Sequence, residues 1–234
     1  GKIYKLKSLI SKPELFIDLG EGKGYIRQLV KYNKEYFILT ENEGLFRADD
    51  RGRITRSYPF LYKENQSINA KKLYVDQKGV LWVGTQLGLF LLDIKTDEMV
   101  TLLANPADRY SLPHNSIWSI YPDPDGGVWI GTYGGKLAYM SFDDNRVVFK
   151  SFSKGGLNSP IVSCFEEDKS GNIWIGTEGG GINCWNRRRN EYSYYTQSLS
   201  NGINYNLIKS LLFDSKKRKI LISSFNGGIS EYNT

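Results

Sequence analysis

The sequence is poor in the residues that build metal centres and membrane spans. Among 234 residues it has two cysteines, two methionines and a single histidine, His114. A structural zinc site takes four ligands, drawn mostly from cysteine and histidine, so we expect no metal site and no cofactor. No apolar run approaches the ~20 residues of a membrane-spanning helix, and the first residues show no signal-peptide pattern.

Aromatic residues and glycine are abundant instead. The chain contains 16 Tyr, 11 Phe and 5 Trp beside 24 Gly, and 40% of its residues are hydrophobic. Aromatic side chains suit the pleated surface of a sheet, and glycine allows tight turns. The composition therefore favours one large all-β domain with a sizeable core.

The net charge of +6 is spread along the chain, apart from two basic clusters. They read Arg-Arg-Arg at residues 187–189 and Lys-Lys-Arg-Lys at residues 216–219. Both fall where we expect short turns between strands. We interpret them as solvated turns and expect no nucleic-acid contact by this segment; a nucleic-acid patch is the alternative that such clusters permit.

One five-residue phrase recurs along the chain at a nearly constant spacing. It reads Leu-Trp-Val-Gly-Thr, Val-Trp-Ile-Gly-Thr and Ile-Trp-Ile-Gly-Thr around Trp82, Trp129 and Trp174. The first two tryptophans are 47 residues apart and the next two are 45 apart. Weaker copies place Phe37 45 residues before Trp82 and Leu221 47 residues after Trp174. Self-similarity with this period is typical of propeller blades and solenoid units.

One repeat shows four short strands joined by tight turns. Residues 161–165 and 173–177 are apolar, 182–185 alternate apolar and polar residues, and 192–195 are more polar. We name these strand positions a to d. The pattern predicts an all-β fold, a β-propeller of four-stranded antiparallel blades with about five repeats of ~46 residues, part of a larger propeller of the seven-bladed type.

We assign residues 1–234 to a single β-propeller domain with a fragment of a blade at each end. The first residues align with strands c and d of a later repeat, and the last ones form a strand c. The boundaries are a partial blade at 1–25, blades at about 26–70, 71–115, 116–160 and 161–206, and a partial blade at 207–234. We expect the open sheet edges to be covered by residues outside this chain or by another copy of it.

Several repeated residues are assigned to architecture. Each Trp most simply fills the core between neighbouring blades, and the Gly after it suits a place where backbones approach closely. The Asp of the a–b turn can accept backbone N–H groups. These structural residues are Trp82, Gly84, Trp129, Gly131, Trp174, Gly176, Asp76, Asp123, Asp168 and Asp214.

The two cysteines fall in one repeat. Cys164 lies on strand a and Cys184 on strand c, two ladder spacings or roughly 9–10 Å apart. A disulfide needs Cα atoms within ~7 Å. We therefore predict two unpaired, buried thiols.

The repeated core Asp-x-x-Gly-x-[Leu/Val/Ile]-Trp-[Ile/Val]-Gly-Thr-x-x-Gly occurs at residues 76–88, 123–135 and 168–180. It resembles the two-component regulator propeller repeat, and Leu-Pro-His-Asn-Ser-Ile-Trp-Ser-Ile at 112–120 resembles the approach to that core. The first repeat departs from the pattern with Leu39 in place of Gly, and the last with Ser223 and Ser224 in place of Gly-Thr.

The resemblance implies the periplasmic sensor region of a Bacteroidetes hybrid two-component system histidine kinase/response regulator. Such a region is extracytoplasmic and belongs to an inner-membrane protein. The implied partners are an unidentified oligosaccharide and a second copy of the receptor in a homodimer. Kinase activity and the membrane anchor would lie in segments outside this chain.

In a propeller the d–a and b–c connections share one rim, and binding sites favour loops on rigid scaffolds. Amides donate and accept hydrogen bonds, and aromatic faces stack on sugar rings, although Asn and Ser are also ordinary loop residues. The ligand-binding candidates are His114, Asn115, Tyr133, Glu178, Asn204, Tyr205, Phe225, Asn226 and Gln86.

Two other functions stay open. A propeller glycosidase or lyase needs two carboxylates at a fixed separation. Glu41 and Glu178 are the loop acids available, but they occupy equivalent positions of different repeats, so we assign no catalytic residue and expect no enzyme activity in this segment. A protein-interaction scaffold is the third reading that repeats of this kind permit.

Overall fold

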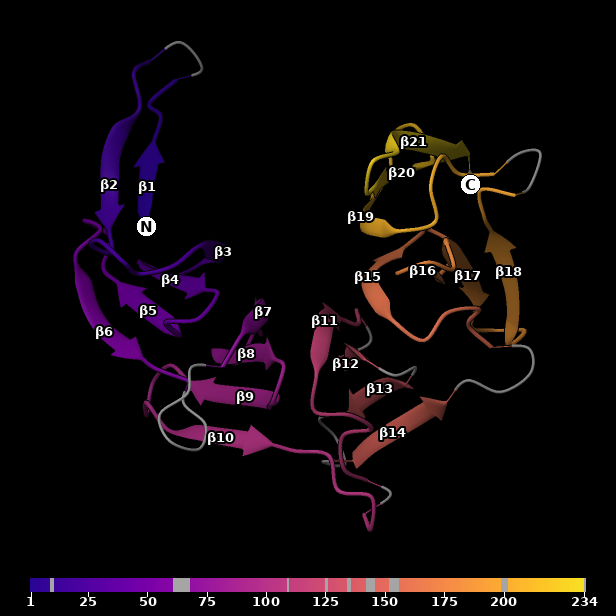
Figure 1. Ribbon diagram of the computed structural model, residues 1–234, viewed down its shortest axis with the longest axis horizontal. Helices are drawn as coiled ribbons and strands as arrows, with labels where there is room; N and C mark the ends of the chain where they lie inside the picture. The colour runs from indigo at the N-terminus through magenta and orange to yellow at the C-terminus, as the bar shows by residue number, and fades with distance from the viewer. Residues whose placement is uncertain are drawn as a thin grey trace. The chain divides into compact units, whose positions relative to one another are not determined.

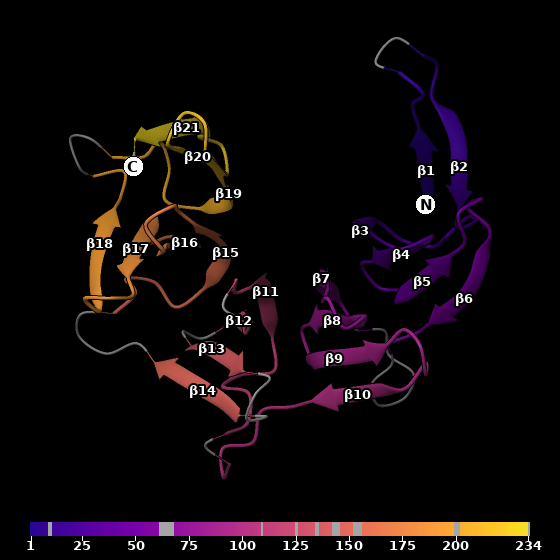
Figure 2. The same ribbon diagram turned by 180° about the vertical axis from the view of Figure 1, so that it is seen from behind.

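The computed structural model describes residues 1–8, 11–60, 68–108, 110–124, 126–133, 136–141, 146–151, 156–198 and 202–233. Within these ranges all regular structure is strand, and the strands form antiparallel sheets whose members follow chain order (Figure 1). The same meanders can be followed from behind in Figure 2. The predicted fold class, an all-β propeller type with four-stranded antiparallel sheets, is confirmed. Nowhere in these ranges does a helix have the length and apolarity that a bilayer crossing needs.

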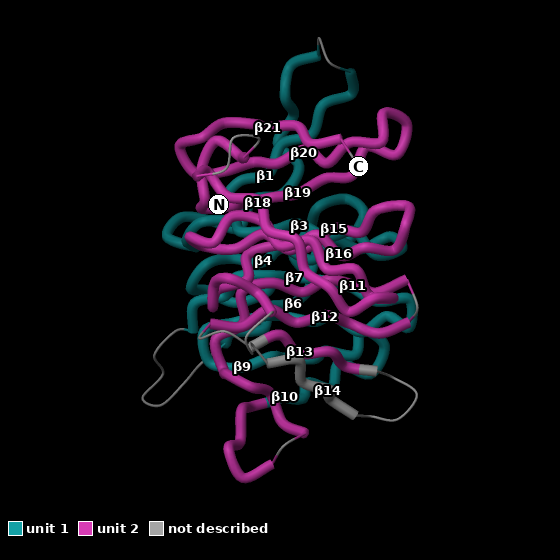
Figure 3. The backbone as a smooth tube through the Cα atoms, turned by 90° about the vertical axis from the view of Figure 1, so that its right-hand side faces the viewer, with its two compact units in different colours: residues 1–102 teal, residues 103–234 magenta. Residues whose placement is uncertain are grey.

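The chain forms two compact units, Gly1–Leu102 and Leu103–Thr234, coloured separately in Figure 3. The first unit holds a two-stranded sheet and two four-stranded sheets. Their strands are β1 (Lys2–Lys5) and β2 (Glu14–Asp18); β3 (Ile26–Tyr32), β4 (Glu35–Thr40), β5 (Leu45–Ala48) and β6 (Ile54–Tyr58); β7 (Ala70–Val75), β8 (Val80–Thr85), β9 (Gly88–Asp93) and β10 (Met99–Leu102).

The second unit holds two four-stranded sheets and a three-stranded sheet. Their strands are β11 (Ile117–Pro122), β12 (Val128–Thr132), β13 (Lys136–Ser141) and β14 (Arg146–Ser151); β15 (Val162–Glu167), β16 (Asn172–Thr177), β17 (Ile182–Asn186) and β18 (Glu191–Tyr195); β19 (Ile208–Asp214), β20 (Lys219–Ser224) and β21 (Gly228–Asn233). That the two units belong to a single propeller domain stays a prediction.

The register places the weak repeat copies where the sequence predicts them. Trp82 pairs with Tyr74 across strands b and a, and Phe37 pairs with Val30 at the same place in the first four-stranded sheet. In the last sheet Leu221 pairs with Leu212. Phe37 and Leu221 are therefore the counterparts of the three tryptophans.

Each repeat tryptophan is buried and hydrogen-bonded to the aspartate six residues before it. Trp82 Nε1 donates to Asp76 Oδ2 at 3.1 Å, Trp129 Nε1 to Asp123 Oδ2 at 2.9 Å, and Trp174 Nε1 to Asp168 Oδ2 at 2.9 Å. The other carboxylate oxygen of Asp168 accepts the backbone N–H groups of Ser170 and Asn172, as the turn prediction required. One carboxylate thus closes the a–b turn and satisfies a buried indole at once.

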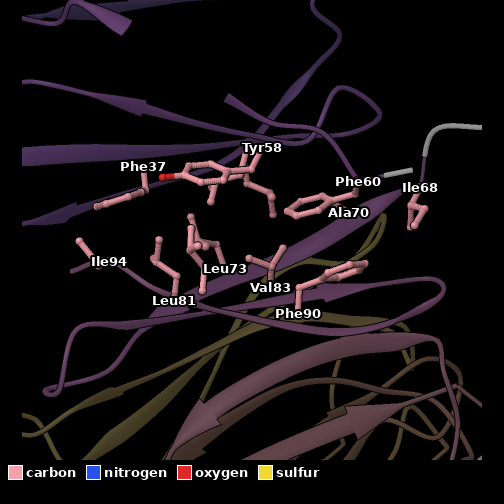
Figure 4. Close-up of a cluster of buried hydrophobic side chains, with 13 residues drawn as sticks. Phe37, Tyr58, Phe60, Ile68, Ala70, Leu73, Leu81, Val83, Phe90 and Ile94 are labelled. Carbon is pink, nitrogen blue, oxygen red and sulfur yellow. The ribbon is translucent and has the colours of Figure 1, made fainter. Parts of the chain in front are cut away.

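Side chains of neighbouring sheets form the core. Figure 4 shows the cluster between sheets β3–β6 and β7–β10, where Phe37 and Tyr58 of one sheet meet Leu73 and Val83 of the other. In the second unit Trp129 packs against Ile173 and Trp185 of the next sheet. Trp174 packs in the same way against Ile208 and Ile220 of the following sheet, so the predicted packing role is confirmed for these two tryptophans.

The glycines two residues after Trp129 and Trp174 make room for the next strand a. A Cβ on Gly131 would lie 2.2 Å from Ser119 Oγ and 3.0 Å from Val162 Cβ; on Gly176 it would lie 2.4 Å from Cys164 Sγ. The crowding is confirmed, but side chains cause most of it rather than backbone. In the first unit the large and the small side chain change places. Leu39 stands in the place of the glycine and packs in one cluster with the small Ala70.

The cysteines lie on β15 and β17 and form no disulfide. Both are half-buried, so the prediction of buried thiols was wrong in degree. Burial and the nearby Asp168 raise the pKa of Cys184 to about 12, because both disfavour a thiolate.

The reading of all basic turn residues as solvated was wrong for Arg187. Its guanidinium pairs with Asp123 at 2.9 Å and with Glu167 at 2.9 Å, and the Asp123 side chain is 2% exposed. Arg187 therefore ties the β17–β18 turn to the a–b turn of the neighbouring sheet. Arg188, Arg189 and Lys216 are exposed, as expected for a solvated turn.

We expect Asp168→Ala to lower the free energy of unfolding by about 2–3 kcal/mol, because the buried indole N–H of Trp174 and the turn N–H groups lose their acceptor. Asp214→Ala is the matched control. Asp214 accepts two turn N–H groups but no indole, so about 1 kcal/mol or less is expected there. Urea unfolding measures both; equal losses in the two variants would contradict the role of the indole bond.

We expect Arg187→Ala to destabilise the chain by about 2–3 kcal/mol, because Asp123 stays buried without its cation. Arg188→Ala, one residue along the same turn, removes the same charge from an exposed position and should cost less than about 0.5 kcal/mol. The same urea measurement decides the matter. A loss for Arg188→Ala as large as that for Arg187→Ala would show that overall charge, not the ion pair, matters.

Candidate functional site

The rim formed by the b–c connections is built in the same way in all five a–b pairs. The residue after strand b donates its backbone N–H to the carbonyl of the residue before strand a, at 2.8 to 3.0 Å. The five donors are Glu41, Gln86, Tyr133, Glu178 and Phe225. All of them were singled out from the sequence, and the bond fixes each at the same height beside strand a.

A β-bulge interrupts strand a next to this bond in every repeat. The bulged residues are Arg27, Lys71, Trp118, Ser163 and Lys209. A bulge leaves one residue out of the ladder and re-aims its side chain. We call these five the bulge residues. Four of the five are large, and together with the b–c residues they supply the side chains of the rim.

In the second unit the rim begins with an aromatic cluster. The rings of Trp118 and Tyr133 are 6.4 Å apart at an angle of 28°, and the ring of His114 lies 5.7 Å from that of Tyr133. Tyr133 is 48% exposed, and His114 is exposed as well. The structure therefore brings two predicted candidates together with a tryptophan that the sequence analysis left out.

A charged cluster occupies the rim further along the same unit. Lys209 Nζ lies 2.5 Å from Glu178 Oε1 and 5.7 Å from the ring centroid of Phe225. Phe225 is 51% exposed, whereas the Glu178 side chain is only 15% exposed. Strands β11 and β15 contact each other, as do β15 and β19, so Trp118, Ser163 and Lys209 follow one another along the rim.

In the first unit the rim carries charged and amide side chains. Arg27 pairs with Glu41, and Asn69 Nδ2 donates to the same carboxylate at 3.1 Å. Burial and the nearby Arg27 lower the pKa of Lys71, while Glu41 acts in the opposite direction. Gln86 is exposed beside this group.

The remaining candidates brace loops. Asn115 Oδ1 accepts the backbone N–H of Ala104 at 2.6 Å, and Asn204 Nδ2 donates to the carbonyl of Gly227 at 3.1 Å. Tyr205 is half-buried against Gly227, and Asn226 takes a left-handed backbone conformation with φ of 59°. These four shape the rim, and their contact with a ligand stays a prediction.

The opposite end of the strands offers a hollow of about 460 Å³, lined by residues that include Glu167, Lys169, Arg187 and Arg188. Its most buried charges already satisfy each other through the Arg187 ion pairs. Among the described residues, no group of three or more His, Cys, Asp or Glu side chains is placed to hold a metal ion. The rim is therefore the stronger candidate site.

Sequence reasoning missed the bulge residues because it treated strand a as uniformly buried. The sequence did contain a signal. Each bulge residue is the second residue of a short apolar strand, yet four of the five are polar or charged. Burying a polar side chain in a strand that is covered on both faces is unfavourable, and a bulge turns that side chain out of the ladder.

Comparison with known proteins agrees with this architecture. Residues 111–134 and 155–179 match the family model described as two component regulator propeller, so the predicted resemblance is confirmed. Histidine kinase P4 of Formosa agariphila is 29% identical over 95% of this chain. The chain spans 18% of that relative's length.

Solved structures with the same fold include extracellular domains named as those of the hybrid two component systems BT3049 and BT4673 of B. thetaiotaomicron. The first has 19% identity over 94% of this chain with a TM-score of 0.59, and the second 17% over 95% with a TM-score of 0.63. The chain spans 36% and 35% of those two structures.

Proposed function

We propose that this chain is part of the extracytoplasmic, ligand-sensing propeller region of a hybrid two-component regulator, and that it recognises an oligosaccharide. The observation that carries the proposal is the match of two repeats to the two component regulator propeller family. The similarity over nearly the whole chain to a histidine kinase and to extracellular domains of hybrid two component systems supports it.

The chemistry of the rim supports a sugar ligand. Exposed aromatic faces at Tyr133 and Phe225 suit the apolar faces of pyranose rings. Fixed polar groups between them, such as Glu178 and Lys209, can accept and donate hydrogen bonds to hydroxyl groups. Such a mixture of apolar faces and few placed polar groups is typical of small-molecule sites.

A glycan-active enzyme is the second candidate, and the rim argues against it. Glu41 is held by Arg27 and Asn69, and Glu178 is held by Lys209. The two carboxylates belong to different compact units and to equivalent positions of the repeat. A carboxylate pair flanking one glycosidic bond needs one acid and one base with distinct surroundings, whereas these two are repeat variants with similar ones.

In this proposal the kinase and the membrane anchor belong to other segments of the intact protein, which would place the chain in the periplasm. Ligand binding would act by favouring one packing of the sensor regions in a receptor homodimer, since a ligand shifts an equilibrium only through its differential affinity for the two states.

Thermal unfolding with a panel of oligosaccharides tests the proposal. We expect at least one plant or host oligosaccharide to raise the Tm without being cleaved, because a ligand that binds only the folded state stabilises it. Chromatography of the same samples reports cleavage.

Cleaved sugar would overturn the proposal in favour of the glycosidase or lyase. An unchanged Tm with every oligosaccharide would favour the interaction scaffold. A Phe225→Ala variant should lose part of the stabilisation, whereas Tyr4→Ala, an aromatic residue that is 54% exposed on β1, should keep it.

A further inference from the structure

Ser116, just before β11, holds three aromatic residues by three different groups. Its backbone N–H donates to His114 Nδ1 at 3.0 Å, and its Oγ accepts the indole N–H of Trp118 at 3.2 Å. Its carbonyl accepts the backbone N–H of Tyr133 at 2.9 Å. The last bond recurs in all repeats; the first two depend on the residues that this repeat alone carries at positions 114 and 118.

These bonds fix how the rings are presented. Because His114 Nδ1 is an acceptor, the proton of the neutral imidazole lies on Nε2, which stays available as a donor. Because the indole N–H of Trp118 is satisfied by Ser116, the ring can lie at the rim without an unpaired polar group. Trp82, Trp129 and Trp174 meet the same need with a buried aspartate instead.

The described charges of the rim in the second unit are paired. Among the rim side chains that the structure describes in this unit, the cation Lys209 is paired with Glu178. A carboxylate or sulfate group on a ligand would find no unpaired cation among these described side chains to compensate its desolvation. An uncharged sugar would lose no such group to burial, and its C–H face would meet the negative face of the rings.

We propose that His114, Trp118 and Tyr133 form a stacking subsite for a neutral pyranose ring, with Ser116 as the positioning residue. The inference rests on the proposed function and adds the ligand class and the residues that contact it. Trp118 supplies the largest apolar face, Tyr133 extends it, and His114 Nε2 donates to a ring hydroxyl.

Calorimetry of the whole chain with cellotetraose, xylotetraose, mannotetraose and tetragalacturonate tests the subsite. We expect one of the neutral tetrasaccharides to bind, and tetragalacturonate to bind at least tenfold more weakly. Trp118→Ala should weaken the neutral ligand about tenfold or more, as expected when a stacking face is lost, whereas Trp118→Phe should keep most of the affinity. Tyr4→Ala is the control for a lost exposed aromatic side chain.

Ser116→Ala tests the positioning role. It should weaken binding several-fold with an unchanged Tm, and Ser116→Thr, which keeps a hydroxyl acceptor for the indole, should restore it. Circular dichroism and the Tm establish that each variant is folded. A variant with a lowered Tm is compared at a temperature where it is fully folded.

The outcomes separate the two proposals. Tight binding of a neutral tetrasaccharide that Trp118→Ala leaves unchanged overturns the subsite and leaves the sensor function standing. Binding of tetragalacturonate alone does the same, because it shows a sugar ligand of the wrong class. Binding of none of the four overturns the subsite, and the wider oligosaccharide panel then decides the fate of the sensor function separately.

Discussion

The bond between a turn aspartate and a buried tryptophan is the constraint on which the repeat depends. A tryptophan is large enough to fill the space between two sheets, but its indole N–H cannot be buried without an acceptor. The aspartate six residues earlier supplies that acceptor and closes the a–b turn with its other oxygen. In the three repeats that carry the tryptophan, one carboxylate therefore links the geometry of the a–b turn to the burial of the indole.

The two ends of the strands have different roles in the structure. At the end with the a–b turns, charged side chains pair with each other. Arg187 forms an ion pair with Asp123, whose carboxylate also accepts the indole N–H of Trp129. At the other end the bulge in strand a turns one side chain per repeat out of the ladder, and a backbone bond fixes the b–c residue beside it. A rigid frame thus carries a row of positions that can vary without disturbing the core.

The sequence predicts the frame well because the frame is periodic. Trp-Gly-Thr at constant spacing locates strand b, and the register places even the divergent Phe37 and Leu221 in the same position. Interactions between repeats are harder to predict, since they join residues without a fixed spacing. Arg187 is 64 residues from Asp123 and reads locally as a solvated turn. Half-burial of Cys184 likewise depends on how a neighbouring sheet covers β17, which no local pattern records.

The candidate site could be predicted only in part, for a related reason. The b–c residues follow directly from the phrase, so Tyr133 and Glu178 are found from the sequence. The bulge residues are not, because a bulge shifts the inward and outward alternation by one and makes an exposed residue look buried.

Trp118 is an example of a rim residue that the sequence alone does not reveal. It lies in an apolar strand, as the structural tryptophans do, yet its indole bonds to a serine at the rim rather than to a turn aspartate in the core. The buried core residue Trp185 gives its indole N–H to Asn190 Oδ1 at 3.2 Å, so the acceptor alone does not define a core tryptophan; Trp118 differs also in being only half-buried. Where a repeat protein holds several tryptophans, burial, position in the blade and the partner of the indole N–H must therefore be considered together to tell the core residues from candidates for recognition.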